Sequence, residues 1–200
     1  MADGLSTFGD EELVRRAVAG SAPCFEEIVR RYQAPLVRFL TRKFPSRRDV
    51  EDILQDTFIK AWQSLHRFDD RYAFRTWLYT IAYRLAVSRG RRDGDEKALP
   101  PDARSSAARP EAAVHKEDER QTLWLRAREV LTEEQYTALW LHYVEDIPAG
   151  DVAQILNRSW VSVKTMMHRA RKRLMPYLAA DGFSAASDSL KVQTVKAGGT

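Results

Sequence analysis

The feature that most constrains this chain is the spacing of its apolar residues, which recur at intervals of three and four positions through residues 12–62. No stretch alternates apolar and polar residues as a half-buried strand would. Because a period of about 3.6 residues gathers side chains on one face of a helix, the spacing predicts an all-α fold. The periodicity is lost between Arg91 and Pro110 and returns from about Glu111. We therefore predict two small helical domains joined by a flexible linker.

Capping signals divide the first domain into helices. Asp10 and Ser21 precede apolar stripes and are predicted to be the N-caps of the first two helices. Ser46, followed three residues later by Asp49, has the pattern of a capping box and predicts the start of a third helix. After a loop over residues 66–73, the apolar stripe resumes in a fourth helix.

The second domain ends in the pattern of a helix-turn-helix. Thr132 with Gln135 forms another capping box ahead of a helix. Two short helices are then predicted over residues 149–156 and 160–174, with a three-residue turn between them. Residues 179–200 are small and mostly polar, so we predict a disordered tail.

Composition narrows the class of protein. The chain has one cysteine, Cys24, and no secretory signal pattern at its start, so the cytoplasm is the expected location. No apolar run approaches the roughly 18 residues of a membrane span, and no membrane insertion is expected. The four histidines lack metal-ligand spacing, and no glycine-rich phosphate loop is present. We therefore expect no cofactor and no metal.

Basic residues are concentrated in two stretches that contain no acid. Residues 71–92 hold six arginines, and residues 158–180 hold six lysines and arginines. A solvated basic face is the simpler explanation for one such stretch. Two of them, on different predicted domains, favour binding to a polyanion such as nucleic acid.

The first basic helix also carries aromatic residues. With Trp77, Ile81 and Leu85 directed to the core, its two tyrosines and Arg84 are expected to face outward. Such rings can stack on unpaired bases while arginines attract phosphates. Half-buried packing is the alternative role for the tyrosines. The candidate DNA-binding residues of this helix are Arg75, Tyr79, Tyr83 and Arg84.

The third helix is acidic on its expected outer side. Its strip of residues at three- and four-residue steps consists of Asp49, Asp52, Gln55, Asp56 and the apolar Ile59. Lys60 is the only base between Asp49 and Gln63. A solvated face would explain the strip, but a protein partner that presents arginine or lysine is the sharper hypothesis.

In this order and spacing, the segments resemble the bacterial extracytoplasmic-function (ECF) sigma factors. The matching segments are DEELVRRA at 10–17, DVEDILQDTFIKAW at 49–62, FRTWLYTIA at 74–82, LTEEQ at 131–135 and VKTMMHRARKRL at 163–174. The resemblance implies a subunit, not an enzyme, that binds core RNA polymerase and directs it to promoter DNA. Proteins of this family often also have an anti-sigma factor as partner.

The resemblance also implies what each part does. Residues 10–92 would be a sigma region 2 domain that binds core polymerase and recognises and melts the minus-ten element. Residues 93–110 would be the linker, and residues 111–178 a region 4 helix-turn-helix domain that recognises the minus-thirty-five element. The implied polymerase-binding residues are Asp52, Gln55, Asp56 and Ile59.

The last predicted helix has a clear division of faces. Val163, Met167, Ala170 and Leu174 form its apolar side. In a helix-turn-helix the N-terminal part of this second helix enters the major groove. Its candidate DNA-binding residues are Trp160, Ser162, Lys164, Thr165, His168 and Arg169.

Several positions depart from the family pattern. Arg84 stands where the family commonly has Asn, Pro148 where it has Ser, and Met166 where it has Arg. The promoter sequence is therefore not predicted.

Two other functions fit the sequence less well. A helix-turn-helix regulator that never engages polymerase leaves the acidic helix unexplained. An enzyme would need a spacing of nucleophile and base that the sequence does not contain.

Overall fold

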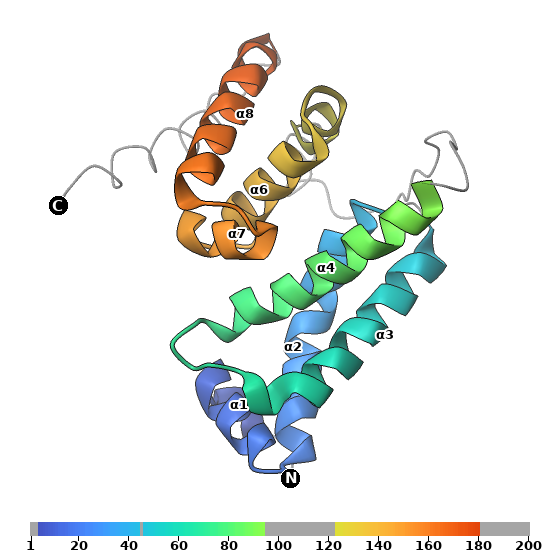
Figure 1. Ribbon diagram of the computed structural model, residues 1–200, viewed down its shortest axis with the longest axis vertical. Coiled ribbons are helices and arrows are strands. Elements are labelled where there is room, and N and C mark those ends of the chain that lie inside the picture. Colours follow the sequence, from blue (N-terminus) through green and yellow to red (C-terminus); the bar gives the residue numbers. More distant parts are fainter. Residues whose placement is uncertain (1–3, 45, 95–122, 181–200) are drawn as a thin grey trace, which may run out of the picture. The chain divides into compact units, whose positions relative to one another are not determined.

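The computed structural model describes residues 4–44, 46–94 and 123–180, and within these ranges the regular structure is helical, with no strand. This confirms the all-α prediction. The chain divides into two compact units, which are considered separately (Figure 1). Among the described residues, no helix has the length and apolar character that crossing a membrane requires.

The first unit is built from four helices and two short 3-10 turns. In chain order they are η1 (Leu5–Thr7), α1 (Asp10–Val18), α2 (Ala22–Thr41), α3 (Arg47–Ser64), η2 (Leu65–Arg67) and α4 (Phe74–Gly94). Helix α2 packs against α1 and α3, and α3 packs along α4 (Figure 1). Each helix buries residues at three- and four-residue steps, as in α3, where these are Val50, Ile53, Leu54, Thr57 and Ala61.

The start of α1 differs from the prediction. Gly9, and not Asp10, is its N-cap, so the assignment of Asp10 as a cap is wrong. The Asp10 carboxylate is engaged by α2 instead. It accepts hydrogen bonds from the Tyr32 hydroxyl and from Nη1 of Arg31, the latter at 3.0 Å. Gly20, with a φ of +99°, lies in the short connection to α2.

The caps of α2 and α3 lie where the sequence placed them. Ser21 is the N-cap residue of α2, although its hydroxyl donates to the Cys24 sulfur and caps no backbone group. Ser46 is the N-cap of α3, and its Oγ accepts a hydrogen bond from the Asp49 backbone N–H at 3.3 Å. This bond satisfies one of the donors that a helix start leaves unpaired.

A charged network ties α2 to the beginning of the chain. The Glu27 carboxylate accepts hydrogen bonds from Nε of Arg30 at 2.7 Å and from Nε of Arg31 at 2.8 Å. Arg31 also donates to the Ser6 carbonyl oxygen at 2.9 Å. The two guanidinium groups lower the pKa of Glu27 from 4.5 to about 2, because they stabilise its ionised form.

The boundary after α4 lies slightly later than expected. Helix α4 continues to Gly94, so the predicted linker over residues 93–110 begins inside this helix. The rest of that linker and the expected beginning of the second domain lie outside the described residues. The first two residues of the predicted disordered tail, 179 and 180, are helical, so that part of the prediction is wrong, and residues 181–200 lie outside the described residues.

The second unit contains the predicted helix-turn-helix. Residues 123–130 are helical, and α6 (Glu133–Tyr143), α7 (Ala149–Leu156) and α8 (Trp160–Ala180) follow. The capping box at the start of α6 is confirmed, since Thr132 Oγ1 accepts from the Gln135 N–H at 3.3 Å while the Gln135 side chain accepts from the Thr132 N–H at 3.1 Å.

The turn between α7 and α8 is set by local backbone chemistry. Asn157 ends α7 with a φ of 53°, a left-handed conformation that asparagine tolerates better than most residues. The Arg158 N–H then donates back to the Ala153 carbonyl at 2.9 Å. Ser159 begins α8, because its Oγ accepts a hydrogen bond from the Ser162 N–H at 3.2 Å.

Candidate nucleic-acid and protein interfaces

The acidic strip of α3 faces outward as predicted, except at its first member. Gln55 and Asp56 are exposed, the Asp52 side chain is 48% exposed, and Ile59 is 45% exposed. Asp49 is turned toward α4, where its Oδ1 lies 2.6 Å from Nη2 of Arg89. The same guanidinium lies 3.9 Å from the Asp52 carboxylate. The outward acidic surface therefore starts at Asp52.

Two aromatic rings extend this surface. Trp62 is 43% exposed and Phe25 is half-buried. Their ring centroids are 4.8 Å apart. Trp62 follows Ile59 by three residues, so the two side chains lie on the same side of α3. Ile59 and Trp62 are both large apolar side chains in water.

The predicted outward position of Tyr79 is wrong. Tyr79 has no exposed surface, and its ring packs edge-on against Phe39 with 5.5 Å between centroids. Helix α4 packs against both α2 and α3, so its buried arc is wider than one stripe. The residues that fill this arc are Phe74, Thr76, Leu78, Tyr79, Ala82 and Ala86.

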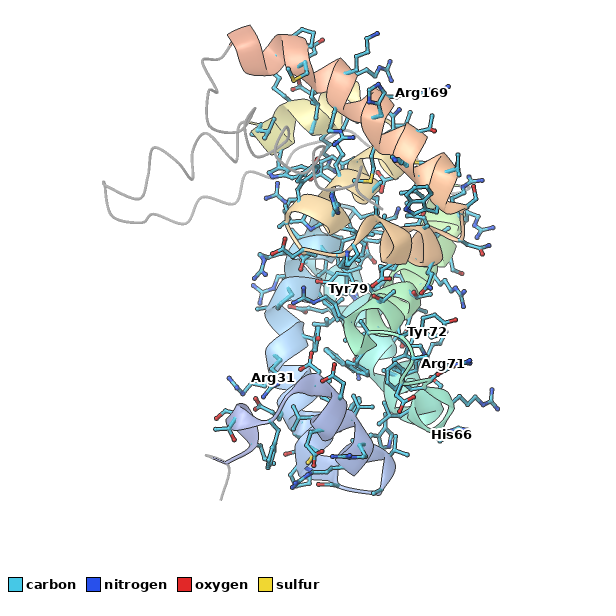
Figure 2. The ribbon with its side chains drawn as sticks, turned by 90° about the vertical axis from the view of Figure 1, so that its left-hand side faces the viewer. Arg31, His66, Arg71, Tyr72, Tyr79 and Arg169 are labelled. Carbon is cyan, nitrogen blue, oxygen red and sulfur yellow. The ribbon has the colours of Figure 1, made fainter. Side chains whose placement is uncertain are left out.

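The three residues of α4 that were predicted to face the core are less buried than expected. Trp77, Ile81 and Leu85 are only half-buried. Figure 2 shows Tyr79 within the first unit, away from its outer edges. A ring in this position cannot stack on a base without unpacking the core.

The other three candidates on α4 remain accessible. Arg75 and Arg84 are exposed, and Tyr83 is half-buried. Lys43, just after α2, places its Nζ 5.6 Å from the centroid of the Tyr83 ring. This contact fixes one side of the ring and joins the end of α2 to α4.

The loop before α4 presents a different aromatic ring. Tyr72 is 48% exposed, and Figure 2 shows it near Arg71 and His66 along one edge of the first unit, on the side away from Arg31. Arg71 donates to the Asp69 carboxylate through Nε at 2.9 Å. Its hydrogen bonds lower the pKa of Asp69. This pair holds the loop so that Tyr72 projects beside the beginning of α4.

Helix α8 divides its faces as predicted. Its four core residues, with side chains between 0% and 3% exposed, are Val163, Met167, Ala170 and Leu174. The six candidate DNA-binding residues, Trp160, Ser162, Lys164, Thr165, His168 and Arg169, are all exposed. Figure 2 shows Arg169 directed away from the unit.

Two side chains on α8 are positioned by contacts within the unit. Lys164 Nζ lies 4.8 Å from the Trp160 ring centroid, so the two residues form a cation–π pair at the start of the helix. Arg171 is half-buried and donates to the Tyr143 hydroxyl at 3.1 Å. Arg171 therefore links α8 to α6.

Within the residues described, no group of three or more His, Cys, Asp or Glu side chains is arranged to hold a metal ion. The outer surfaces instead carry basic side chains in both units and an acidic, apolar strip on α3. These features, together with the helix-turn-helix, define a two-domain helical DNA-binding protein.

Comparison with known proteins identifies the family within this class. Residues 28–95 match the sigma-70 region 2 family, and residues 121–174 match the sigma-70 region 4 family. The ECF RNA polymerase sigma-E factor of Haemophilus influenzae is 32% identical over 180 residues, covering 82% of this chain and 93% of that protein. The RNA polymerase sigma-H factor of Pseudomonas aeruginosa is 30% identical over 185 residues, covering 84% and 95%.

Solved structures show the same fold. The structure of CnrH, from its complex with the cytosolic domain of CnrY, aligns with a TM-score of 0.61 at 24% identity, covering 86% of this chain and 98% of that one. The sigma factor RpoE of Bartonella quintana, in complex with the anti-sigma factor NepR, aligns with a TM-score of 0.60 at 24% identity, covering 78% and 98%. The chain belongs to the ECF RNA polymerase sigma factors, which are transcription initiation factors.

Proposed function

We propose that this chain directs core RNA polymerase to promoters through three separate surfaces. Helix α3 binds the polymerase, the loop before α4 and α4 itself act at the minus-ten element, and α8 reads the minus-thirty-five element. The observation that carries the proposal is the division of α8. Its core residues are buried while the side chains at its N-terminal part are exposed, as a helix that enters the major groove requires.

The polymerase-binding surface proposed here consists of Asp52, Gln55, Asp56 and Ile59, extended by Trp62. Its combination of acid and exposed apolar surface suits a partner helix that carries arginine or lysine beside apolar residues. A face needed only for solubility would not expose both Ile59 and Trp62.

The minus-ten surface proposed here consists of Arg75, Arg84 and Tyr72, with Tyr83 at its border. The arginines supply attraction to phosphates, and the exposed Tyr72 ring supplies a stacking platform for an unpaired base. The predicted domain of residues 10–92, which α4 extends to Gly94, is proposed to act at the minus-ten element, and that of residues 111–178 at the minus-thirty-five element.

The minus-thirty-five surface proposed here consists of the exposed side chains on α8. Ser162 and Thr165 are suited to contact base edges, while Lys164, His168 and Arg169 are suited to contact phosphates. Trp160 adds apolar surface at the first turn of the helix.

Three further properties belong to the proposal. The chain works without catalysis of its own, it acts in the cytoplasm, and an anti-sigma factor controls it. The last is supported by the relative from Bartonella quintana, which was solved in complex with an anti-sigma factor.

The test is transcription in vitro. The purified chain and core polymerase should together produce promoter-dependent transcripts that neither produces alone. Co-purification with core polymerase separates this function from that of a helix-turn-helix regulator that binds DNA only. DNA binding without affinity for core polymerase would contradict the proposal.

A further inference from the structure

A third acid-free stretch lies outside the surfaces described above. Residues 28–48 contain seven lysines and arginines and neither Asp nor Glu. Arg30 and Arg31 are bound to Glu27. The remaining five gather where α2 ends and α3 begins, and we name them the corner patch. The corner patch consists of Arg38, Arg42, Lys43, Arg47 and Arg48.

The fold brings these five side chains to one corner. Arg38 and Arg42 are four residues apart at the end of α2, so they lie on the same side of the helix. Phe44, only 5% exposed, anchors the connection in the core. Arg47 and Arg48 then form the first two residues of α3. Arg38, Arg47 and Arg48 are exposed, while the other two are half-buried.

The acids nearest to the corner patch do little to neutralise it. Asp49 is paired with Arg89 at 2.6 Å. Glu51 pairs with Arg47 at 2.7 Å, but both side chains are largely exposed, and such pairs are weak. Within the part of the chain that the structure describes, Arg38 and Arg48 form no ion pair. Arg38 and Arg48 therefore give the corner patch positive charge that no acid among the described residues neutralises.

The corner patch is continuous with the basic surface of α4. Lys43 lies over the Tyr83 ring, and Arg89 reaches the first turn of α3. The C-terminal half of α4, which carries the exposed Arg84 and Arg91, thus lies beside the corner. Along α4, Arg89 is fifteen residues beyond Phe74, or about 22 Å at 1.5 Å per residue. The corner is thereby separated from the loop that presents Tyr72.

The kind of ligand follows from what the corner lacks. Among the described residues of the first unit, the large apolar side chains that are exposed are Val18, Ile59, Trp62 and Tyr72, and none of them belongs to the segment from Arg38 to Arg48. Stable protein interfaces depend on aromatic or apolar anchors at their centre. Contacts to a phosphate backbone come from arginine, lysine and other polar groups and need no apolar anchor.

We propose that the corner patch binds the phosphate backbone of double-stranded DNA without reading its sequence. This contact rests on the proposed function only in that the duplex is promoter DNA held by the polymerase. It gives the first unit a contact with duplex DNA that is separate from the loop where strand opening is proposed.

The test is the salt dependence of promoter binding by the holoenzyme. Fluorescence anisotropy with a fluorescein-labelled promoter duplex gives the affinity over a range of salt concentrations. Each phosphate contact contributes about 0.9 to the slope of log affinity against log salt. Arg38→Ala with Arg48→Ala should therefore lower the slope by about 1.8, with unchanged affinity for core polymerase.

A matched variant controls for net charge. Arg15→Ala with Lys60→Ala removes two exposed charges from α1 and α3, away from the corner, and should leave the slope unchanged. A wild-type slope in the corner variant would overturn the inference, as would an equal change in the control. Lower core affinity with an unchanged slope would instead identify an acidic protein as the ligand. If the wild-type chain bound no promoter with core polymerase, the proposed function itself would fail.

Directed cleavage provides an independent measurement. Cys24 is the only cysteine of the chain and is 2% exposed, so Arg48→Cys creates a single accessible thiol. An iron chelate attached there should cut duplex promoter DNA in the holoenzyme, whereas the same chelate on Arg15→Cys should not. Absence of cleavage from position 48 would contradict the proposed contact.

Discussion

Tyr79 and Tyr72 show that burial decides what an aromatic side chain can do. Tyr79→Ala should lower the free energy of unfolding by about 3–5 kcal/mol, because it leaves a cavity beside Phe39.

Tyr72→Ala should change stability by no more than about 0.5 kcal/mol. It should reduce initiation on duplex promoters, since each stacked base contributes about 1–3 kcal/mol, and spare initiation on pre-opened templates. Chemical denaturation and transcription assays measure both effects. Equal activity loss on the two templates would show that Tyr72 does not assist opening.

Glu27 should make the stability of the first unit sensitive to acid. Its pKa is lowered to about 2 by Arg30 and Arg31, so its contribution is complete above the unfolded value near 4.5 and disappears as the pH falls toward 2. Glu27→Gln should reduce stability at neutral pH and flatten the decline over this range. Denaturation at a series of pH values provides the measurement. Glu26→Gln, at an exposed position of α2, is the matched control. If the stability of Glu27→Gln fell with pH in parallel with that of the wild type, Glu27 would not be the source of the acid sensitivity.

Helix α3 illustrates how one element can present opposite chemistry on two faces. Asp52→Arg with Asp56→Arg should abolish binding to core polymerase, because reversed charge across a complementary interface costs several kcal/mol. Helicity should be unchanged, since the buried residues of α3 lie on its other side. Circular dichroism and a pull-down with core polymerase test the two statements.

The control for this variant reverses two acids elsewhere. Glu11→Arg with Glu26→Arg changes exposed residues on α1 and α2 by the same charge. It should bind core polymerase as the wild type does. If the α3 variant retained wild-type affinity, α3 would not be the docking helix.

Helix α8 separates affinity from sequence preference. Lys164→Ala should weaken promoter binding and lower the salt slope by about one, if Lys164 neutralises one phosphate as proposed. Thr165→Ala should change the preferred base more than the affinity. Binding assays on a set of minus-thirty-five variants distinguish these effects. If neither Lys164→Ala nor Thr165→Ala changed promoter binding or base preference, α8 would not be reading DNA.

The elements that could be predicted from sequence are those with local signals. Ser46 and Thr132 mark the helix starts at which the structure finds their caps. The faces of α8 were also predictable, because this helix buries a single stripe. Helix α4 was not, since it packs on two neighbours and a tyrosine there fills either a core or a surface position equally well. The corner patch escaped prediction because it depends on the junction of two helices.

At the scale of the whole molecule, function depends on having two units in one chain. Each unit has its own core and presents its own basic surface. In the proposed function, each surface recognises one of two promoter elements, so neither surface alone would specify a promoter. Covalent connection makes the second binding event intramolecular, which raises its effective concentration and the overall affinity.

Cutting the connection should therefore weaken promoter binding without unfolding either unit. A specific protease site inserted between Ser105 and Ser106 allows the intact chain to be cleaved after purification. The cleaved protein should bind promoter DNA with core polymerase about 10²-fold more weakly than the uncleaved insertion variant, which is its control. Far-ultraviolet circular dichroism should be the same before and after cleavage, because the cut lies between the two sets of helices. If the cleaved halves initiated transcription as efficiently as the uncut variant at equal concentration, the polymerase would be holding the two units in register, and their covalent connection would contribute nothing to promoter selection.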